Sequence, residues 1–232
     1  MFFPQLITGI MPTDRVLEVG PGANPHPRAD EMLELRYANE DERTHQVGNA
    51  RPLITSKKVT YYDGGAFPYA DGSFDYVICA HVLEHVHDIE SFLFEVFRVG
   101  RRGYFEYPLA YYDLLYNIAA HVNLLKYVDG RMRYLRKSDT HMGEFKALQS
   151  LLAQTMKKGH TKLIDEMPDL FMEGLEWEQP FATQRVFDVE AIAHSGYRIP
   201  ARSETSLDYY GGRKLLSHLV KVALRRLSLL KG

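Results

Sequence analysis

Three acidic side chains lie in or directly after three successive short apolar segments, a placement that suits the binding of a polar ligand. Glu18 lies within VLEV, Glu34 within MLEL, and Asp63 directly after KVTYY. A carboxylate inside an apolar strand is costly unless it has a partner, such as a ligand's ammonium group or a backbone N–H group. An acid at the end of a second strand can accept hydrogen bonds from both hydroxyls of a ribose. Each acid alone also fits an ordinary surface or turn position. Together, the three acids predict a ligand-binding site along one edge of a sheet.

A glycine turn follows the first of these segments. Gly20 and Gly22 lie in the stretch GPGANP. Glycines after a strand let a ligand approach backbone N–H groups without meeting a Cβ atom. The dinucleotide-binding fingerprint reads G-x-G-x-x-G, and this chain has Pro25 at the position of the third glycine. A nicotinamide-dependent oxidoreductase is therefore an alternative that the sequence disfavours, and the turn at Asp63 also argues against it.

Three histidines lie in the stretch AHVLEHVHD, at positions 81, 85 and 87. His81 and His85 are four residues apart, which would place them on one face of a helix. Either could act as a general base in catalysis, and the alternative is that His85 packs the loop and orients its neighbours. Glu84 is expected to cap or pair rather than to catalyse. We expect no metal here, because no third ligand follows at metal-site spacing.

These residues must be positioned by a series of short strands and helices. Apolar strands are expected over residues 15–20, 32–35, 58–62, 74–79 and 103–107. Asp88 is expected to cap a helix that runs to about Val99. Strands that are apolar on both faces predict a mostly parallel sheet covered by helices. Further along, we expect helices over 110–127 and 141–158, a hairpin at 128–131, and final antiparallel strands over 176–189 and near Tyr197.

The composition of the chain excludes several classes of protein. With 232 residues and 45% hydrophobic content, the chain can form a single domain over 1–232 with a proper core. A net charge of −2 gives no basic field for nucleic acid. The single cysteine, Cys79, excludes an internal disulfide and fits a reducing compartment. The start lacks the pattern of a secretory signal, and no apolar run is long enough to span a bilayer, so we expect a soluble cytoplasmic protein.

Three longer motifs carry a resemblance to a known family. EVGPG, DGGAFPYADGSFDYVICAHVLEHV and FRVGRRGYFEYP resemble class I S-adenosylmethionine-dependent methyltransferases, and fit best the methyltransferase type 11-like subgroup. That subgroup has D-x-x-x-L-P-F after its third strand, then S-F-D-x-V and V-L-E-H. The resemblance covers Arg15 to Pro108 and implies a doubly wound, seven-stranded, mostly parallel Rossmann-like sheet with an antiparallel final strand. It implies a cofactor-binding core over about 12–108, and a helical and hairpin insertion with acceptor contacts over about 109–205.

The resemblance also implies roles for residues of this chain in binding S-adenosylmethionine. The loop with Glu18, Gly20 and Gly22 would contact the methionine part of the cofactor, and Glu34 the ribose. Asp63 would accept a hydrogen bond from the exocyclic amine of the adenine, and Gly64 would add a backbone contact. Ala80 and His81 would line the floor near the sulfonium. The chain departs from the family in the short segment between Gly22 and Glu34, where members have a full helix, and in Phe67, where leucine is commoner.

The expected reaction is methyl transfer to a small-molecule or glycan/lipid-linked acceptor, and the alternative is a non-catalytic cofactor-binding partner protein. An aromatic group at 111, 112 and 116 would suit an acceptor pocket, although tyrosines at helical spacing are also typical of a core. Glu106 is expected either to touch the acceptor or to pair with an arginine at 101 or 102. The C-terminal segment over about 210–231 is basic and amphipathic, with a stripe of cations that includes Lys214 and Arg225. It predicts peripheral membrane contact, with a homodimer or packing on its own domain as alternatives.

Overall fold

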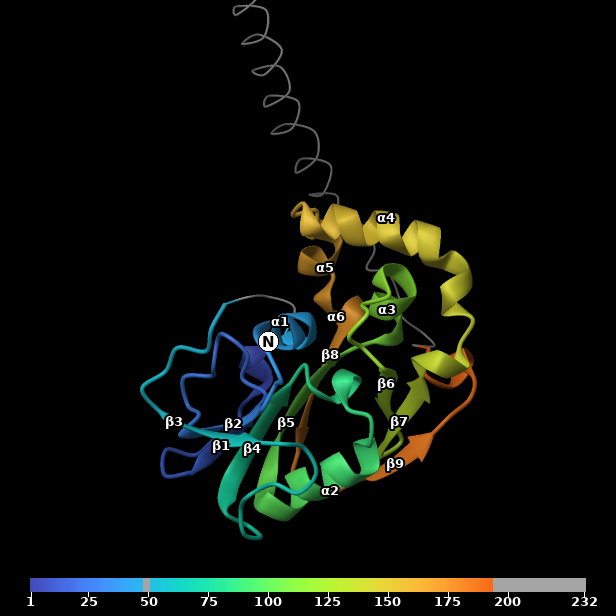
Figure 1. The fold of residues 1–232 in the computed structure, drawn as a ribbon. Helices are drawn as coiled ribbons and strands as arrows, with labels where there is room; N and C mark the ends of the chain where they lie inside the picture. The colour runs from blue at the N-terminus through green and yellow to red at the C-terminus, as the bar shows by residue number, and fades with distance from the viewer. Residues whose placement is uncertain (48–50, 194–232) are drawn as a thin grey trace, which may run out of the picture. The chain divides into compact units, whose positions relative to one another are not determined.

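The computed structural model describes residues 1–47 and 51–193 (Figure 1). The chain divides into one unit of Met1–Ser195 and a second of Gly196–Gly232. The second unit lies outside the described residues, as do the strand predicted near Tyr197 and the helix predicted over 210–231. All of the described residues belong to the first unit.

The centre of this unit is a mostly parallel sheet, which confirms the predicted α/β class. Its strands are β1 (Val16–Val19), β2 (Glu31–Leu35), β3 (Lys58–Tyr62), β4 (Phe74–Ala80), β5 (Gly100–Pro108) and β8 (Met172–Trp177). Their order is β3-β2-β1-β4-β5-β8, and only β8 runs antiparallel to its neighbour. The strand order reverses between β1 and β4, and ligands of such sheets bind outside the carboxyl ends of the strands at this point. Six strands lie in this sheet within the described residues, against the seven predicted.

The two faces of the sheet are covered in different ways. The helix α2 (Ile89–Val99) packs Leu93 and Val96 into the main core, and the Asp88 side chain caps it by accepting a hydrogen bond from the Ser91 N–H group at 3.0 Å, as predicted. Tyr76 and Tyr104 belong to a separate buried cluster, and the N-terminal segment packs against that cluster. A further helix, α1 (Glu40–Val47), lies between β2 and β3 in the sequence.

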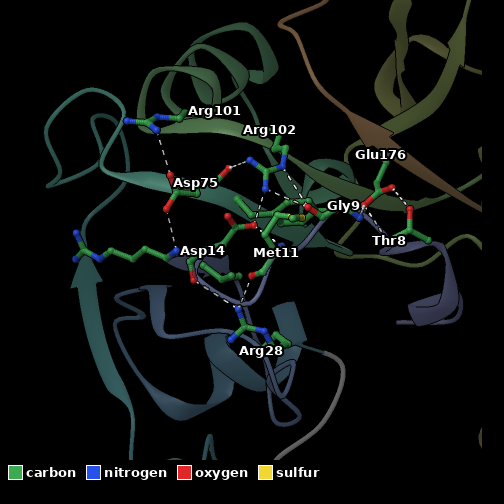
Figure 2. A network of polar contacts seen from close by, with 12 residues as sticks. Thr8, Gly9, Met11, Asp14, Arg28, Asp75, Arg101, Arg102 and Glu176 are labelled. Carbon is green, nitrogen blue, oxygen red and sulfur yellow. Dashed lines mark hydrogen bonds and ion pairs between the residues drawn. The ribbon is translucent and has the colours of Figure 1, made fainter.

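The N-terminal segment is pinned to the sheet by two charged side chains (Figure 2). The Arg102 guanidinium donates to the carbonyl oxygen of Gly9 at 3.1 Å and to Asp14 Oδ2 at 2.6 Å. The Glu176 carboxylate accepts hydrogen bonds from the N–H groups of Thr8 at 2.9 Å and Gly9 at 2.7 Å. Arg102 lies near the amino end of β5, so these contacts fix the segment at the sheet edge opposite to the carboxyl ends.

The chain after β5 forms a helical and hairpin insertion. Its elements are α3 (Ala110–Tyr116), β6 (Asn123–Val128), β7 (Arg131–Arg136), α4 (Lys146–Lys157), α5 (Lys162–Glu166), α6 (Pro168–Phe171) and β9 (Ala182–Arg185). Short 3-10 turns cover Pro4–Leu6, Leu83–His85, Lys137–Asp139, Met142–Phe145 and Val189–Ala191. The predicted hairpin is present, because Asp129 and Gly130 both adopt positive φ angles, 51° and 72°, as a two-residue hairpin turn requires.

Two predictions about this insertion were wrong. The helix predicted over 110–127 ends at Tyr116, because Asn117 adopts the left-handed conformation at φ 46° and a strand begins at Asn123. The final antiparallel strand is Met172–Trp177, earlier than predicted, whereas Ala182–Arg185 pairs in parallel with β7 in a separate sheet of order β6-β7-β9. Periodicity alone did not reveal these tertiary pairings.

In the part of the chain that the structure describes, no helix has both the length and the apolar character needed to cross a membrane.

The contact between β4 and β5 gives a first testable prediction. A Cβ atom on Gly103 would overlap the carbonyl oxygen of Val77 and press on Trp177, and backbone cannot move aside easily. We expect Gly103→Ala to lower the free energy of unfolding by more than about 3 kcal/mol in urea denaturation. Gly143→Ala is the control, because a Cβ there meets no atom within 4 Å. Equal midpoints for the two variants would contradict the described packing.

Candidate functional site

A cleft of about 1760 Å³ opens at the carboxyl ends of the parallel strands. One wall is built from the loops after β1, β2 and β3, and includes Gly20, Gly22 and Glu34. The other wall is built from the insertion and includes Tyr112 and His121. The cleft therefore lies where the strand order reverses, which is where the topology predicts a ligand.

The glycine loop after β1 has a conformation that only glycine adopts readily. Gly20 and Gly22 have φ angles of 63° and 59°. A Cβ atom on Gly20 would lie 2.6 Å from Val82 Cγ2, so the loop packs directly against the chain that follows β4. The Gly20 N–H group donates to the Leu33 carbonyl oxygen at 2.9 Å, which holds the loop to β2. Both glycines line the cleft and leave it open to a ligand.

Glu18 is buried in β1, and its partner is a backbone donor, which is one of the two partners that the sequence allowed. Its Oε2 accepts a hydrogen bond from the His26 N–H group at 2.6 Å. Burial raises the pKa of Glu18 to about 7, although this hydrogen bond acts in the opposite direction. Because the carboxylate does not line the cleft, its role in the structure is to hold the loop that follows β1.

Glu34 and Asp63, at neighbouring strand ends, point to different surroundings. Glu34 is buried at 7% exposure, lines the cleft, and has its pKa raised by burial. The Asp63 side chain is 81% exposed and pairs with Arg36 Nε at 3.0 Å. Asp63 does not line the cleft, but Gly64 after it does. Of the three acids expected at one binding edge, Glu34 alone lines the cleft.

Ala80 and His81 lie at the end of β4 and line the cleft, as the resemblance implied. His81 Nε2 lies 2.8 Å from Glu106 Oε1, and Nδ1 lies 3.4 Å from Glu84 Oε1. Burial lowers the pKa of His81, but the two carboxylates outweigh burial and raise it to about 9. At neutral pH the ring is an imidazolium without a free lone pair, which is poorly suited to the base role predicted for it.

Glu106 is buried below this imidazolium and is an anchor for the N-terminal segment. It accepts hydrogen bonds from the N–H groups of Phe2 at 2.6 Å and Phe3 at 2.9 Å. Burial tends to raise its pKa, but His81 and these donors lower it to about 2. The predicted pairing of Glu106 with an arginine at 101 or 102 was wrong, because those side chains bind Asp75 and Asp14.

A second polar group lines the cleft where the turn after β4 meets the insertion. His85 Nδ1 lies 3.0 Å from the carbonyl oxygen of Ala120, and His121 Nδ1 lies 2.7 Å from Asp113 Oδ2. The two imidazole rings meet edge to face with centroids 4.9 Å apart. His121 and Asp113 were missed in the sequence, because neither has a motif and the insertion brings them to His85 only through folding.

The tyrosines of the insertion line the cleft in part and also pack in a core cluster. Tyr112 and Tyr116 line the cleft, and they also pack in a cluster with Phe171 and Ile164. Tyr111 packs against the same cluster and is not part of the cleft wall. This part of the insertion wall is therefore aromatic and is itself held by a small core.

Residues 17–105 match the family model described as a methyltransferase domain. This segment is therefore similar to a methyltransferase domain, in agreement with the resemblance that its motifs carry. It contains the glycine loop, Glu34 and the end of β4, and the insertion that follows lies outside the match.

Several solved structures are similar to parts of the chain. An S-adenosylmethionine-dependent methyltransferase from Thermotoga maritima is 22% identical over 45% of this chain and 48% of its own, with a TM-score of 0.32. YcgJ from Bacillus subtilis is 20% identical over 47% and 54%, with a TM-score of 0.34. An S-adenosylmethionine-dependent methyltransferase from Mesorhizobium loti is 19% identical over 52% and 56%, with a TM-score of 0.32. The chain thus covers about half the length of each of them.

The different surroundings of Glu34 and Asp63 predict unequal effects on cofactor binding. We expect Glu34→Ala to weaken binding of S-adenosylhomocysteine about 10- to 100-fold, because a buried carboxylate makes strong hydrogen bonds to hydroxyls. We expect Asp63→Ala to weaken it less than about tenfold, because water competes at this exposed position. Isothermal titration calorimetry measures both. A larger loss for Asp63→Ala than for Glu34→Ala would show that Asp63 turns into the cleft on binding.

The raised pKa of His81 predicts how stability depends on pH. The pairing of His81 stabilises the fold fully below the unfolded-state pKa of about 6.5, and this contribution is lost as the pH rises through about 9. The wild type should therefore be more stable than His81→Gln at pH 6.5. This difference in the free energy of unfolding should fall by on the order of 2 kcal/mol between pH 6.5 and 9.5. Urea denaturation at a series of pH values measures it, and a difference that stays constant with pH contradicts the pairing.

Proposed function

We propose that this protein transfers a methyl group from S-adenosylmethionine to an acceptor bound between the glycine loop and the insertion. The observation that carries the proposal is the position of the cleft. One wall belongs to the methyltransferase domain and the other to the insertion, so that donor and acceptor can meet at the end of β4. The nicotinamide-dependent alternative has no comparable support.

The residues on the domain wall fit the cofactor. Glu34 is a buried carboxylate facing the cleft and suits the two hydroxyls of a ribose. Gly20 and Gly22 leave room for the methionine part, and a Cβ at Gly64 or Gly65 would meet no atom within 4 Å, which leaves an open place for the adenine edge. When bound, the cofactor supplies a sulfonium methyl group that is open to in-line displacement by a nucleophile.

The protein's own contribution to this reaction is to position the acceptor and to remove its proton. His81, held as a cation between two carboxylates, acts as a positioning residue that fixes the floor of the cleft. His85 stays the candidate base, because the Ala120 carbonyl oxygen can only accept, and the proton on Nδ1 leaves a lone pair on Nε2.

The acceptor that we propose is a small molecule or a glycan/lipid-linked intermediate with an apolar or sugar-like face. The support is the aromatic wall of Tyr112 and Tyr116 on the acceptor side. Contact of the segment 210–231 with a membrane or a second copy, and a cytoplasmic location, stay predictions.

The test follows a labelled methyl group. The full chain is incubated with methyl-labelled S-adenosylmethionine and size-fractionated cell extract, and label is sought by mass spectrometry in low-mass and lipid-linked fractions. We expect transfer by the wild type and slower transfer by Glu34→Ala at a cofactor concentration that saturates only the wild type. Cofactor binding without transfer to any fraction would support the non-catalytic alternative, and no heat with S-adenosylhomocysteine in calorimetry would overturn the proposal.

A further inference from the structure

We propose that Glu84, His85 and His121 bind a divalent transition-metal ion on the acceptor side of the cleft. All three residues line the cleft. One ligand atom from each lies within 4.8 Å of the others. Bonds of about 2.0–2.2 Å to one metal ion place ligand atoms roughly 3–4 Å apart, so small side-chain rotations complete the site.

Both histidines are held in the tautomer that a metal ligand needs. The Ala120 carbonyl oxygen and the Asp113 carboxylate are acceptors, so each Nδ1 carries a proton and donates it. The lone pair of each ring is therefore on Nε2. Asp113 is itself fixed by Lys137 Nζ at 2.9 Å. A histidine whose second nitrogen donates to a carboxylate or carbonyl is the usual arrangement behind a metal ligand.

Glu84 supplies the independent observation that points to a ligand. The residue is 1% exposed, and its Oε2 atom has no hydrogen-bond partner within residues 1–47 and 51–193. Its Oε1 atom lies 3.4 Å from His81 Nδ1 and 3.9 Å from His85 Nε2. A buried carboxylate oxygen without a partner is unfavourable, and a cation between Glu84 and the two imidazoles would satisfy it.

The backbone fixes the three ligands relative to one another, although they come from distant parts of the chain. The Val122 N–H group donates to the Glu84 carbonyl oxygen at 2.7 Å. The Asn123 amide donates to the carbonyl oxygens of Leu83 at 3.1 Å and Val86 at 2.6 Å. The start of β6, directly after His121, is therefore locked to the turn that holds Glu84 and His85. A preorganised site of this kind loses little freedom when a metal binds.

The chemistry of the ligands indicates which ions would bind. The ionisable groups around them are three carboxylates, Glu84, Glu106 and Asp113, and three basic groups, His81, Lys137 and the Met1 ammonium, which lies 3.7 Å from Glu106 Oε1. These groups balance in number, so the choice of ion depends on the type of ligand atom and not on a net field. Two imidazoles and one carboxylate suit zinc, iron, manganese or cobalt, whereas magnesium and calcium prefer all-oxygen sites.

The metal site deepens the proposed function, on which its chemical role rests. Three protein ligands leave positions open toward the cleft, where an acceptor hydroxyl can bind and lose its proton to solvent. The acceptor oxygen would then form its bond to the methyl carbon as the carbon–sulfur bond breaks and its electron pair stays on sulfur. In this arrangement His85 Nε2 binds the metal instead of acting as base, and the acceptor is an alcohol or phenol.

Binding of cobalt tests the site without reference to activity. The full chain is freed of metal with a chelator and titrated with Co²⁺, followed by visible absorption, with Zn²⁺ as competitor and Mg²⁺ in a parallel titration. We expect one Co²⁺ per chain, displaced by Zn²⁺ and not by Mg²⁺. His121→Ala and the isosteric Glu84→Gln should weaken Co²⁺ binding by at least about 100-fold, and Asp113→Asn by about 10- to 100-fold. His141→Ala is the matched control, because this side chain is 92% exposed and outside the cleft wall.

Each variant is also titrated with S-adenosylhomocysteine and checked by circular dichroism. Retained folding and cofactor binding in Glu84→Gln, together with lost Co²⁺ binding, would support the site. Equal Co²⁺ affinities for His121→Ala, Glu84→Gln and the control would overturn it, whatever the cofactor titration shows. Methyl transfer that is unchanged by removal of the metal would overturn its chemical role.

Discussion

The structure around the cleft depends on the buried pairing of His81 with Glu106 and Glu84. Glu106 belongs to β5 and also receives the N–H groups of Phe2 and Phe3 from the N-terminal segment. Glu84 belongs to the turn after β4, and its backbone oxygen binds Val122 at the start of the hairpin. One imidazolium thus connects the sheet, the N-terminal segment and the insertion. Removing its charge would take the shared imidazolium partner from two buried carboxylates, which is more costly than losing an exposed pair.

This pairing also explains the unusual backbone of His81. A φ angle of 58° is disfavoured for residues other than glycine, and asparagine or histidine adopts it only where surroundings fix it. The His81 N–H group donates to the Glu106 carbonyl oxygen at 2.7 Å while its ring reaches the Glu106 carboxylate, so both ends of the residue are fixed by β5. The turn directs Glu84 inward, where its second oxygen has no protein partner among the described residues. The positive φ angle of His81 and the unpartnered oxygen of Glu84 therefore both belong to the turn that follows β4.

Local physical chemistry was enough to predict the parallel strands, the Asp88 cap and the Asp129–Gly130 turn. Each of these features depends on neighbours within a few residues, and each is where the sequence placed it. The direction of a side chain at a strand end depends on partners elsewhere. Asp63 was expected to face the ligand, yet Arg36 pairs with it on the outside. The same limit applied to His121, whose partner Asp113 belongs to a helix whose end the periodicity missed.

One wall of the cleft comes from residues 17–105, which have recognisable motifs, and the other comes from the insertion, which has none. The two walls differ in chemistry. The wall formed by residues 17–105 offers glycines, buried carboxylates that include Glu34 and Glu84, and the His85 imidazole. The insertion wall offers the His121 imidazole and the aromatic rings of Tyr112 and Tyr116. Because hydrogen bonds from Val122 and Asn123 fix the insertion to the turn after β4, the two walls cannot vary independently. A change at the start of β6 would therefore act directly on the turn that holds Glu84 and His85, because the two segments share these hydrogen bonds.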